Sequence, residues 1–279
     1  MTQKGLIQKI INATGMQDCN GHWVPTTQQA LGHDPDGQPM KERWGYSSII
    51  GILLYLSTNT RPDIAHAVSQ VAQFSAAPKQ SHALAAKTIV RYLKKTFDKG
   101  TIVNPTQTFG LDCYVDADFA GLYKREPDED PVSVKSRTGY VITLAGFPLL
   151  WRSRLQTEIA LSTTEAEYAA LSLATRVLLP LRDLLIEVTT GIGMSSATIG
   201  NVYCRAHEDN NGALALANNQ RLTSRTKHFL IKWHHFWEAV RSGKLQVLPI
   251  DTKEQSADYC TKGLDRSSFE ANWFRVQGW

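Results

Sequence analysis

The stretch from Leu111 to Gly121 constrains the fold most, because it has the pattern of a strand that carries carboxylates into a sheet. Read with a period of two, one face is apolar and consists of Leu111, Cys113 and Val115. The other face is polar and contains Asp112, Tyr114, Asp116 and Asp118. The pattern therefore predicts a strand that places a carboxylate inside a sheet and then ends in a glycine turn.

Acidic residues far downstream make chemical sense if they fold back onto this strand. Glu165 and Glu167 open a strong helical pattern, Glu208 and Asp209 end a second apolar strand, and Asp258 lies in a short polar segment. Carboxylates contributed by four separate elements fit a pair of hard divalent cations better than a role in core packing. The sequence therefore predicts a metal site built from distant segments.

Composition sets the broad class. The chain has 279 residues, of which 20% are charged and 42% hydrophobic, as in a globular protein with one large or two modest domains. The longest apolar run, residues 49–56, is too short to span a bilayer, and residues 1–4 do not open an export signal. The cysteines lack paired spacing, so we expect reduced thiols of an intracellular protein: Cys19, Cys113, Cys204 and Cys260.

Residues 1–110 carry most of the basic surplus, with 11 lysines and arginines against 6 acidic residues. Residues 1–43 are polar and rich in turn residues, so we expect them to be mostly irregular, whereas 44–110 predict a small helical module. Its third helix, at about 81–97, places four basic residues along one side: Lys87, Arg91, Lys94 and Lys95. This side is either a solvated face or a surface that contacts phosphates.

After residue 110 the pattern changes to strands. Residues 111–116, 139–145 and 149–155 predict an antiparallel meander. Ser162 and Glu165 form a capping box that starts a helix, with Glu165 turned back toward the Ser162 amide. Glu167 shares a side with the apolar stripe that must face the sheet, so a metal or a shared proton explains its position better than packing does. Pro180 is expected to kink this helix or end its first part.

The last third predicts alternating strands and helices. Strands are expected at 201–206 and 244–250, and helices at 213–217, 226–241 and 255–262, the last of which holds Asp258. The helix at 226–241 carries Lys227 and Lys232 among aromatic and histidine residues. A zinc site there is disfavoured, because the adjacent residues His234 and His235 diverge around a helix.

Several blocks, in this order, carry a family resemblance. Residues 111–265 resemble the ribonuclease H domain of copia-type retrotransposon Pol polyproteins through Tyr114-Val115-Asp116-Ala117-Asp118, Ser136-Arg137-Thr138-Gly139-Tyr140, Thr163-Thr164-Glu165-Ala166-Glu167, Arg225-Thr226-Lys227-His228 and Gln255-Ser256-Ala257-Asp258. The helical module resembles the thumb or connection part of the same family's reverse transcriptase, through Thr60-Arg61-Pro62-Asp63-Ile64 and residues 89–94. The Tyr-x-Asp-Asp polymerase motif does not occur in the sequence, so we expect no polymerase activity.

The resemblance implies an α/β fold, namely a ribonuclease H-like mixed five-stranded sheet flanked by helices and preceded by a small all-α module. The implied domains are an irregular segment at 1–43, the helical module at 44–110, the ribonuclease H-like domain at 111–265 and a C-terminal tail at 266–279. The family's metal-binding carboxylates fall on Asp116, Glu167, Asp209 and Asp258, where they would hold two Mg²⁺ ions, with Mn²⁺ as a substitute.

The implied activity is hydrolysis of the RNA strand of RNA–DNA hybrids. Lys87, Arg91, Lys94, Lys95, Lys227 and Lys232 are the candidate contacts to the hybrid. The palm and fingers of a longer polyprotein are a second implied partner, and no membrane is expected. The implied location is inside the cell, in the cytoplasm, the nucleus or virus-like particles.

Two departures from the family pattern leave alternatives open. Residues 247–257 lack the histidine that many ribonucleases H place shortly before the last aspartate, and the fourth strand meets Asp209 through the more charged Arg205-Ala206-His207-Glu208. The alternative is a catalytically inactive remnant that acts only as a nucleic-acid-binding or structural module. Another nuclease or an integrase of the same fold fits less well, because those usually rely on three acids.

Overall fold

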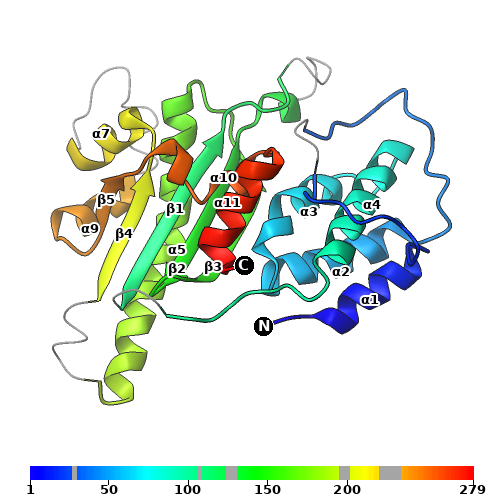
Figure 1. Cartoon of the computed structure of the whole chain (residues 1–279). Coiled ribbons are helices and arrows are strands. Elements are labelled where there is room, and N and C mark those ends of the chain that lie inside the picture. The colour runs from blue at the N-terminus through cyan, green and yellow to red at the C-terminus, as the bar shows by residue number, and fades with distance from the viewer. Residues whose placement is uncertain (27–29, 106–108, 124–130, 195–201, 220–233) are drawn as a thin grey trace.

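The computed structural model describes residues 1–26, 30–105, 109–123, 131–194, 202–219 and 234–279. Within these residues, five strands form one mixed sheet in the order β3-β2-β1-β4-β5. The pairs β1–β2 and β2–β3 are antiparallel, whereas β1–β4 and β4–β5 are parallel. This arrangement confirms the expected ribonuclease H-like fold, with helices on both sides and a helical module before it (Figure 1).

The strands lie close to the predicted positions. Their bounds are β1 Gly110–Asp118, β2 Arg137–Leu144, β3 Phe147–Leu155, β4 Tyr203–Glu208 and β5 Gln246–Pro249. The first three form the predicted antiparallel meander. The apolar face of β1 is buried in the core with Cys204 and Ala206 of β4, as the period-two pattern requires.

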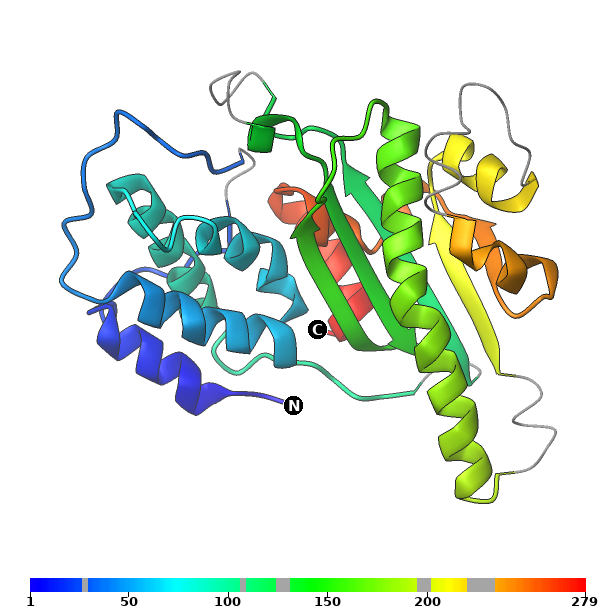
Figure 2. The same cartoon turned by 180° about the vertical axis from the view of Figure 1, so that it is seen from behind.

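Helix α5 (Thr163–Gly191) covers one face of the sheet and extends past its end (Figure 2). Tyr168, Leu171 and Leu178 are among the α5 residues that pack in the core against β1 and β2. The helix continues through Pro180, so of the two predicted outcomes the ending of the helix at this residue is wrong. A proline inside a helix removes one backbone hydrogen bond, and α5 continues past it despite that loss.

Shorter elements cover the β4–β5 side of the sheet. They are α7 (Asn211–Asn219), a 3-10 turn at His234–Phe236, α9 (Trp237–Arg241) and a second 3-10 turn at Thr252–Glu254. The predicted helix at 226–241 lies partly outside the described residues, and its described end consists of the first 3-10 turn and α9.

The helical module comprises α1 (Lys4–Ala13), α2 (Tyr46–Asn59), a 3-10 turn at Pro62–Ile64, α3 (Ala65–Ala72) and α4 (Gln80–Lys95). Helix α1 departs from the expectation that residues 1–43 are mostly irregular. Its Ile7, Ile10 and Ile11 have helical spacing and are buried, so tertiary packing stabilises a short helix in an otherwise polar segment.

Helices α10 (Asp258–Thr261) and α11 (Arg266–Gln277) lie on the sheet face opposite to α5, beside α3 (Figure 1). Most of residues 266–279, predicted to be a tail, therefore form a packed helix. The Asp265 side chain accepts a hydrogen bond from the Ser268 amide at its start, and Gly278 ends it at a φ of 80°. Phe269 and Val276 share a core with the helical module and with Val141 of β2.

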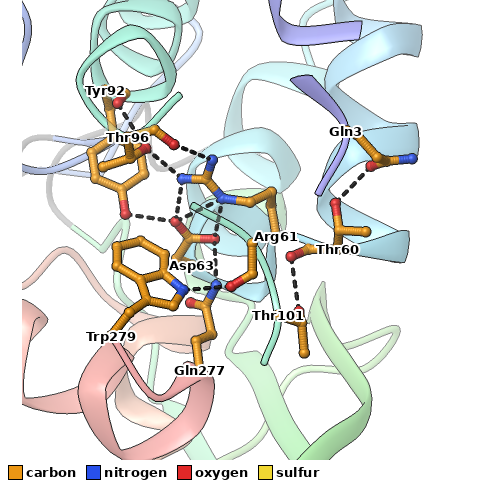
Figure 3. Close-up of polar contacts among 10 residues, drawn as sticks. Gln3, Thr60, Arg61, Asp63, Tyr92, Thr96, Thr101, Gln277 and Trp279 are labelled. Atoms are coloured by element: carbon orange, nitrogen blue, oxygen red, sulfur yellow. Dashed lines mark hydrogen bonds and ion pairs between the residues drawn. The ribbon is translucent and has the colours of Figure 1, made fainter. Parts of the chain in front are cut away.

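A buried polar network joins the helical module to the end of α11 (Figure 3). The Arg61 guanidinium lies 2.7 Å from the Asp63 carboxylate and donates to the Thr96 hydroxyl. Tyr92 donates to the same Asp63 oxygen, Oδ2, at 2.5 Å, and the Gln277 side chain donates to Oδ1 at 3.3 Å. The predicted family motif at residues 60–64 thus serves to connect segments far apart in the sequence.

Two expectations from composition can be compared with the structure. The described helices include none with the length and apolar character needed to cross a bilayer. All the cysteines are free thiols, and Cys113, Cys204 and Cys260 are buried, as the unpaired spacing predicts.

Candidate metal centre

Asp116 lies near the end of β1 on the face that carries α10. It pairs in register with Gly139 of β2, where an added Cβ would come within 2.8 Å of the Cys260 Cβ. Glycine is needed here because α10 packs directly on β2. This close approach brings the Thr261 hydroxyl onto Asp116, to which it donates a hydrogen bond. Burial raises the pKa of Asp116, although the nearby Lys262 and Thr261 oppose that rise.

Glu167 enters the site from the first turns of α5. The Ser162 side chain accepts a hydrogen bond from the Glu165 amide, as the predicted cap requires. The Glu165 carboxylate accepts from the Leu161 amide at 2.9 Å and not from Ser162, so the return contact lies one residue earlier than predicted. Glu167 is only 5% exposed. The structure therefore separates the two glutamates into a capping residue and a buried residue that faces Asp116.

Asp209 follows β4 directly, and its side chain completes a cluster. Ligand oxygens of Asp116, Glu167 and Asp209 all lie within 4.8 Å of one another. Burial, then repulsion from Asp116, raises the pKa of Glu167 to about 11. Among the described residues, the Glu167 Oε2 atom is buried and has no hydrogen-bond partner. A buried oxygen of this kind, surrounded by further carboxylates, fits a hard divalent cation.

Asp258 is the first residue of α10 and lies beside the cluster. Its Oδ1 atom is 2.8 Å from the Lys262 ammonium, which is also 3.8 Å from Asp116. Burial, then repulsion from Asp116, raises the pKa of Asp258 to about 6. The structure thus brings Asp116, Glu167 and Asp209 into direct proximity and connects Asp258 to them through Lys262. The assignment of all four as metal ligands stays a prediction.

Glu208 is a further acidic residue of the site, whose part the sequence left open. It continues the buried side of β4, is fully buried and accepts a hydrogen bond from the Asn210 amide at 3.0 Å. Burial raises the pKa of Glu208 to about 8, and repulsion from Asp209 and Asp116 adds to this. Alternation along β4 is the signal that places Glu208 inward.

Lys262 is the contact that sequence reasoning missed. It lies four residues after Asp258, a spacing at which opposite charges meet on a helix. This spacing was present in the sequence. It was overlooked because α10 has only four residues and Lys262 lies just past its end.

Asp112 lies on the same strand as Asp116, but its carboxylate is paired with basic side chains and its pKa is shifted in the opposite direction. It is buried, but Arg205 binds it at 2.8 and 2.9 Å and His207 at 2.7 Å. Burial acts to raise the pKa of Asp112, yet the hydrogen bonds from His207 and Arg205 lower it to about 2. The unusual Arg205 before Asp209 therefore neutralises Asp112, and His207 hydrogen-bonds to Asp112 and stacks on Tyr114.

The four predicted basic contacts on α4 each bind the segment before α2. Lys87 pairs with Glu42 at 2.7 Å, Arg91 donates to the Asn20 carbonyl, Lys94 donates to the Cys19 carbonyl, and Lys95 lies over the Trp23 ring. These contacts give all four side chains a structural role, and their binding to nucleic acid stays a prediction. Lys227 and Lys232 lie outside the described residues.

The histidines considered as zinc ligands include His235, which makes structural contacts in the described part of the chain. The His235 ring lies 3.2 Å from the Ser172 hydroxyl and 3.3 Å from the Thr175 hydroxyl of α5. His228 lies outside the described residues. The described ring therefore packs against α5 through hydroxyl contacts.

Comparison with known proteins identifies the family, although no protein-family model matches the chain. The "Retrovirus-related Pol polyprotein from transposon TNT 1-94" of Nicotiana tabacum is 38% identical over 225 residues, which cover 81% of this chain and 16% of that protein. The corresponding polyprotein from transposon RE1 of Arabidopsis thaliana is 36% identical over 234 residues, covering 84% of this chain and 15% of that protein.

The chain belongs to the copia-type retrotransposon Pol polyprotein family. It spans about one sixth of the length of these Pol relatives. A "Secreted RxLR effector protein 161" of Plasmopara viticola is 41% identical over 131 residues, which cover 47% of this Pol segment and 87% of that protein. Among solved structures, LC11-RNase H1 from compost aligns with 58% of the Pol segment and 96% of its own chain, at 17% identity and a TM-score of 0.37.

Proposed function

We propose that this Pol segment hydrolyses the RNA strand of RNA–DNA hybrids at the carboxylate cluster. The observation that carries the proposal is the convergence of Asp116, Glu167 and Asp209 within 4.8 Å, with a buried oxygen that no described group binds. Membership of a Pol family adds support, because such elements copy RNA into DNA. Asp258 is the fourth proposed ligand.

The residues of the site perform separate tasks in this proposal. Asp116, Glu167, Asp209 and Asp258 would hold two Mg²⁺ ions, which would supply an activated water and neutralise the charge on the leaving oxygen. Asp116 is oriented by the Thr261 hydroxyl, and Glu167 is fixed by the start of α5. Burial of these carboxylates excludes water and makes their interactions with a cation stronger. Recognition of the hybrid would rest on backbone shape and 2′-hydroxyls, not on base sequence.

A cleavage assay tests the proposal directly. A labelled RNA–DNA hybrid is incubated with the chain and Mg²⁺, beside duplex DNA and duplex RNA of the same sequence. We expect cleavage of the RNA strand of the hybrid alone, and its loss in Asp116→Asn and after addition of EDTA. Binding of the hybrid without cleavage at any Mg²⁺ concentration would instead assign the chain to the inactive, nucleic-acid-binding class.

Binding of the hybrid is a separate part of the proposal. The carboxylate cluster is anionic and repels the phosphates of the hybrid, so other residues must supply the affinity. The basic side of α4 and the residues Lys227 and Lys232 are the proposed contacts. Each phosphate contact that is removed should reduce the log–log salt slope of binding by about one. Neutralising Lys87, Arg91, Lys94 and Lys95 together should therefore flatten the slope and leave turnover at saturating substrate nearly unchanged.

The contacts of the α4 side chains sharpen this test. If the four side chains serve only to hold residues 17–42, the salt slope stays at the wild-type value while the stability falls. Measuring affinity across a salt series and unfolding by urea on the same variant separates the two roles. An unchanged slope leaves Lys227 and Lys232 as the remaining candidates.

A further inference from the structure

Lys262 places a positive charge between two of the proposed metal ligands. Its ammonium lies 2.8 Å from Asp258 and 3.8 Å from Asp116, and its side chain is 40% exposed. The residue directly follows α10, and Gly263 follows it. The ammonium therefore reaches both carboxylates from the solvent side of the cluster, on a flexible stem that begins at a helix end.

The charge balance of the cluster explains why a cation is held there. Asp116, Glu167, Glu208, Asp209 and Asp258 lie close enough to repel one another. Lys262 acts against this repulsion, since it lowers the pKa of Asp116, Glu167 and Asp258 relative to burial alone. An ammonium can substitute for part of the charge of a divalent ion, but it offers no open position for a water.

We propose that Lys262 is a tethered cation that occupies the place of one divalent ion between Asp116 and Asp258 and must leave when that ion binds. The inference rests on the proposed metal centre and adds a regulation to it. An ammonium 2.8 Å from Asp258 and 3.8 Å from Asp116 repels a divalent ion bound between the same two carboxylates, so binding of that ion displaces the ammonium. The exposure of the side chain gives the ammonium a solvated position to move to.

The displacement has a measurable consequence for metal affinity. Breaking a partly exposed ion pair opposes metal binding, so the ion between Asp116 and Asp258 should bind more weakly than the ion held by Asp116, Glu167 and Asp209. Removing the ammonium charge removes the competition. We expect Lys262→Gln to bind the weaker ion about two- to fivefold more tightly, as expected for an ion pair of modest strength.

A metal affinity that does not rise in Lys262→Gln would indicate a different role for Lys262. If Lys262 only orients Asp258 and remains in place when metal binds, its loss would leave Asp258 less ordered. Lys262→Gln would then bind the weaker ion less tightly than the wild type, or equally. Either result overturns the proposal.

The test is calorimetric titration of the full chain with Mn²⁺ in the absence of nucleic acid. Lys262→Arg keeps the charge and should bind the weaker ion no more tightly than the wild type. Lys244→Gln, an exposed lysine before β5, is the matched control and should leave both affinities unchanged. Failure to bind Mn²⁺ in any variant would overturn both this proposal and the metal centre. Two wild-type sites with no effect of Lys262→Gln would overturn this proposal alone.

Thermal unfolding gives a second, independent readout. In EDTA, Lys262→Gln should be less stable than the wild type, because the carboxylates lose their internal counter-ion. Saturating Mn²⁺ should remove that difference, since the metal then supplies the charge. If Lys262→Gln is unfolded in EDTA, the proposal predicts that Mn²⁺ refolds it. A stability loss that persists at saturating Mn²⁺ would mean that Lys262 is a structural residue only.

Discussion

Replacing Glu167 by glutamine should stabilise the metal-free chain, because the native site forces this carboxyl to keep a proton. Burial and the neighbouring carboxylates raise the pKa of Glu167 from its ordinary value of 4.5 to about 11. Between these values the folded chain holds a proton that the unfolded chain releases. The contribution of Glu167 to the free energy of unfolding is therefore greatest below pH 4.5. It decreases as the pH rises above that value.

The size of the effect follows from the same linkage. Each pH unit above 4.5 lowers the free energy of unfolding by about 1.4 kcal/mol while the folded state stays protonated. At pH 7 the accumulated loss is about 3 kcal/mol. Glutamine has nearly the same shape as protonated glutamate and cannot ionise. We therefore expect Glu167→Gln to equal the wild type near pH 4 and to exceed its unfolding free energy by up to about 3 kcal/mol at pH 7.

Urea unfolding in EDTA, followed across pH 4 to 7.5, measures this difference. Glu165→Gln is the matched control, because Glu165 lies on the same turn of α5 but binds the Leu161 amide. It should develop no advantage as the pH rises. Adding Mg²⁺ should reverse the order, since the wild type gains binding free energy that Glu167→Gln has lost. Parallel pH profiles for the wild type and Glu167→Gln would refute the assignment of Glu167 to a repulsive carboxylate cluster.

Four further substitutions, in three experiments, test other parts of the structure. Asp116→Asn should abolish hybrid cleavage, whereas Asp118→Asn, nearer the end of β1, should be milder; equal and complete loss in both would show that the strand register is misassigned. Asp63→Asn should lower the free energy of unfolding by about 3–5 kcal/mol in urea, because it leaves Arg61 buried without its counter-charge; a loss below about 1 kcal/mol would contradict the network. Gly139→Ala should displace α10 and weaken Mn²⁺ binding along with a stability loss of about 1–3 kcal/mol; wild-type affinity would show that the contact is not tight.

Local pattern predicted the elements that carry the carboxylates. The alternation of β1 places Asp116 on the polar face, and the Ser162 cap fixes which glutamate of α5 turns toward the sheet. Both depend on residues close in sequence, which is why they could be read without a structure.

The features that the sequence did not predict depend on contacts between distant segments. Residues 266–279 form a helix because Phe269 and Val276 meet the core of the helical module, which no local signal reveals. The cap at Asp265 and the glycine at 278 would have indicated the helix, but not its place. Lys262 was missed for a similar reason, since its contact with Asp116 exists only where α10 crosses β2.

The network of Figure 3 also bears on the order in which the chain folds during synthesis. Asp63 and its partner Gln277 are separated by 214 residues, which take roughly 10 to 40 s to translate at 5–20 residues per second. The helical module therefore emerges long before the last donor to its buried charge pair, and we expect it to stay loosely closed until α11 docks. Hydrogen exchange on a chain truncated after residue 265 measures this directly: fast exchange of the α4 amides is expected, and full protection would show that the module closes by itself.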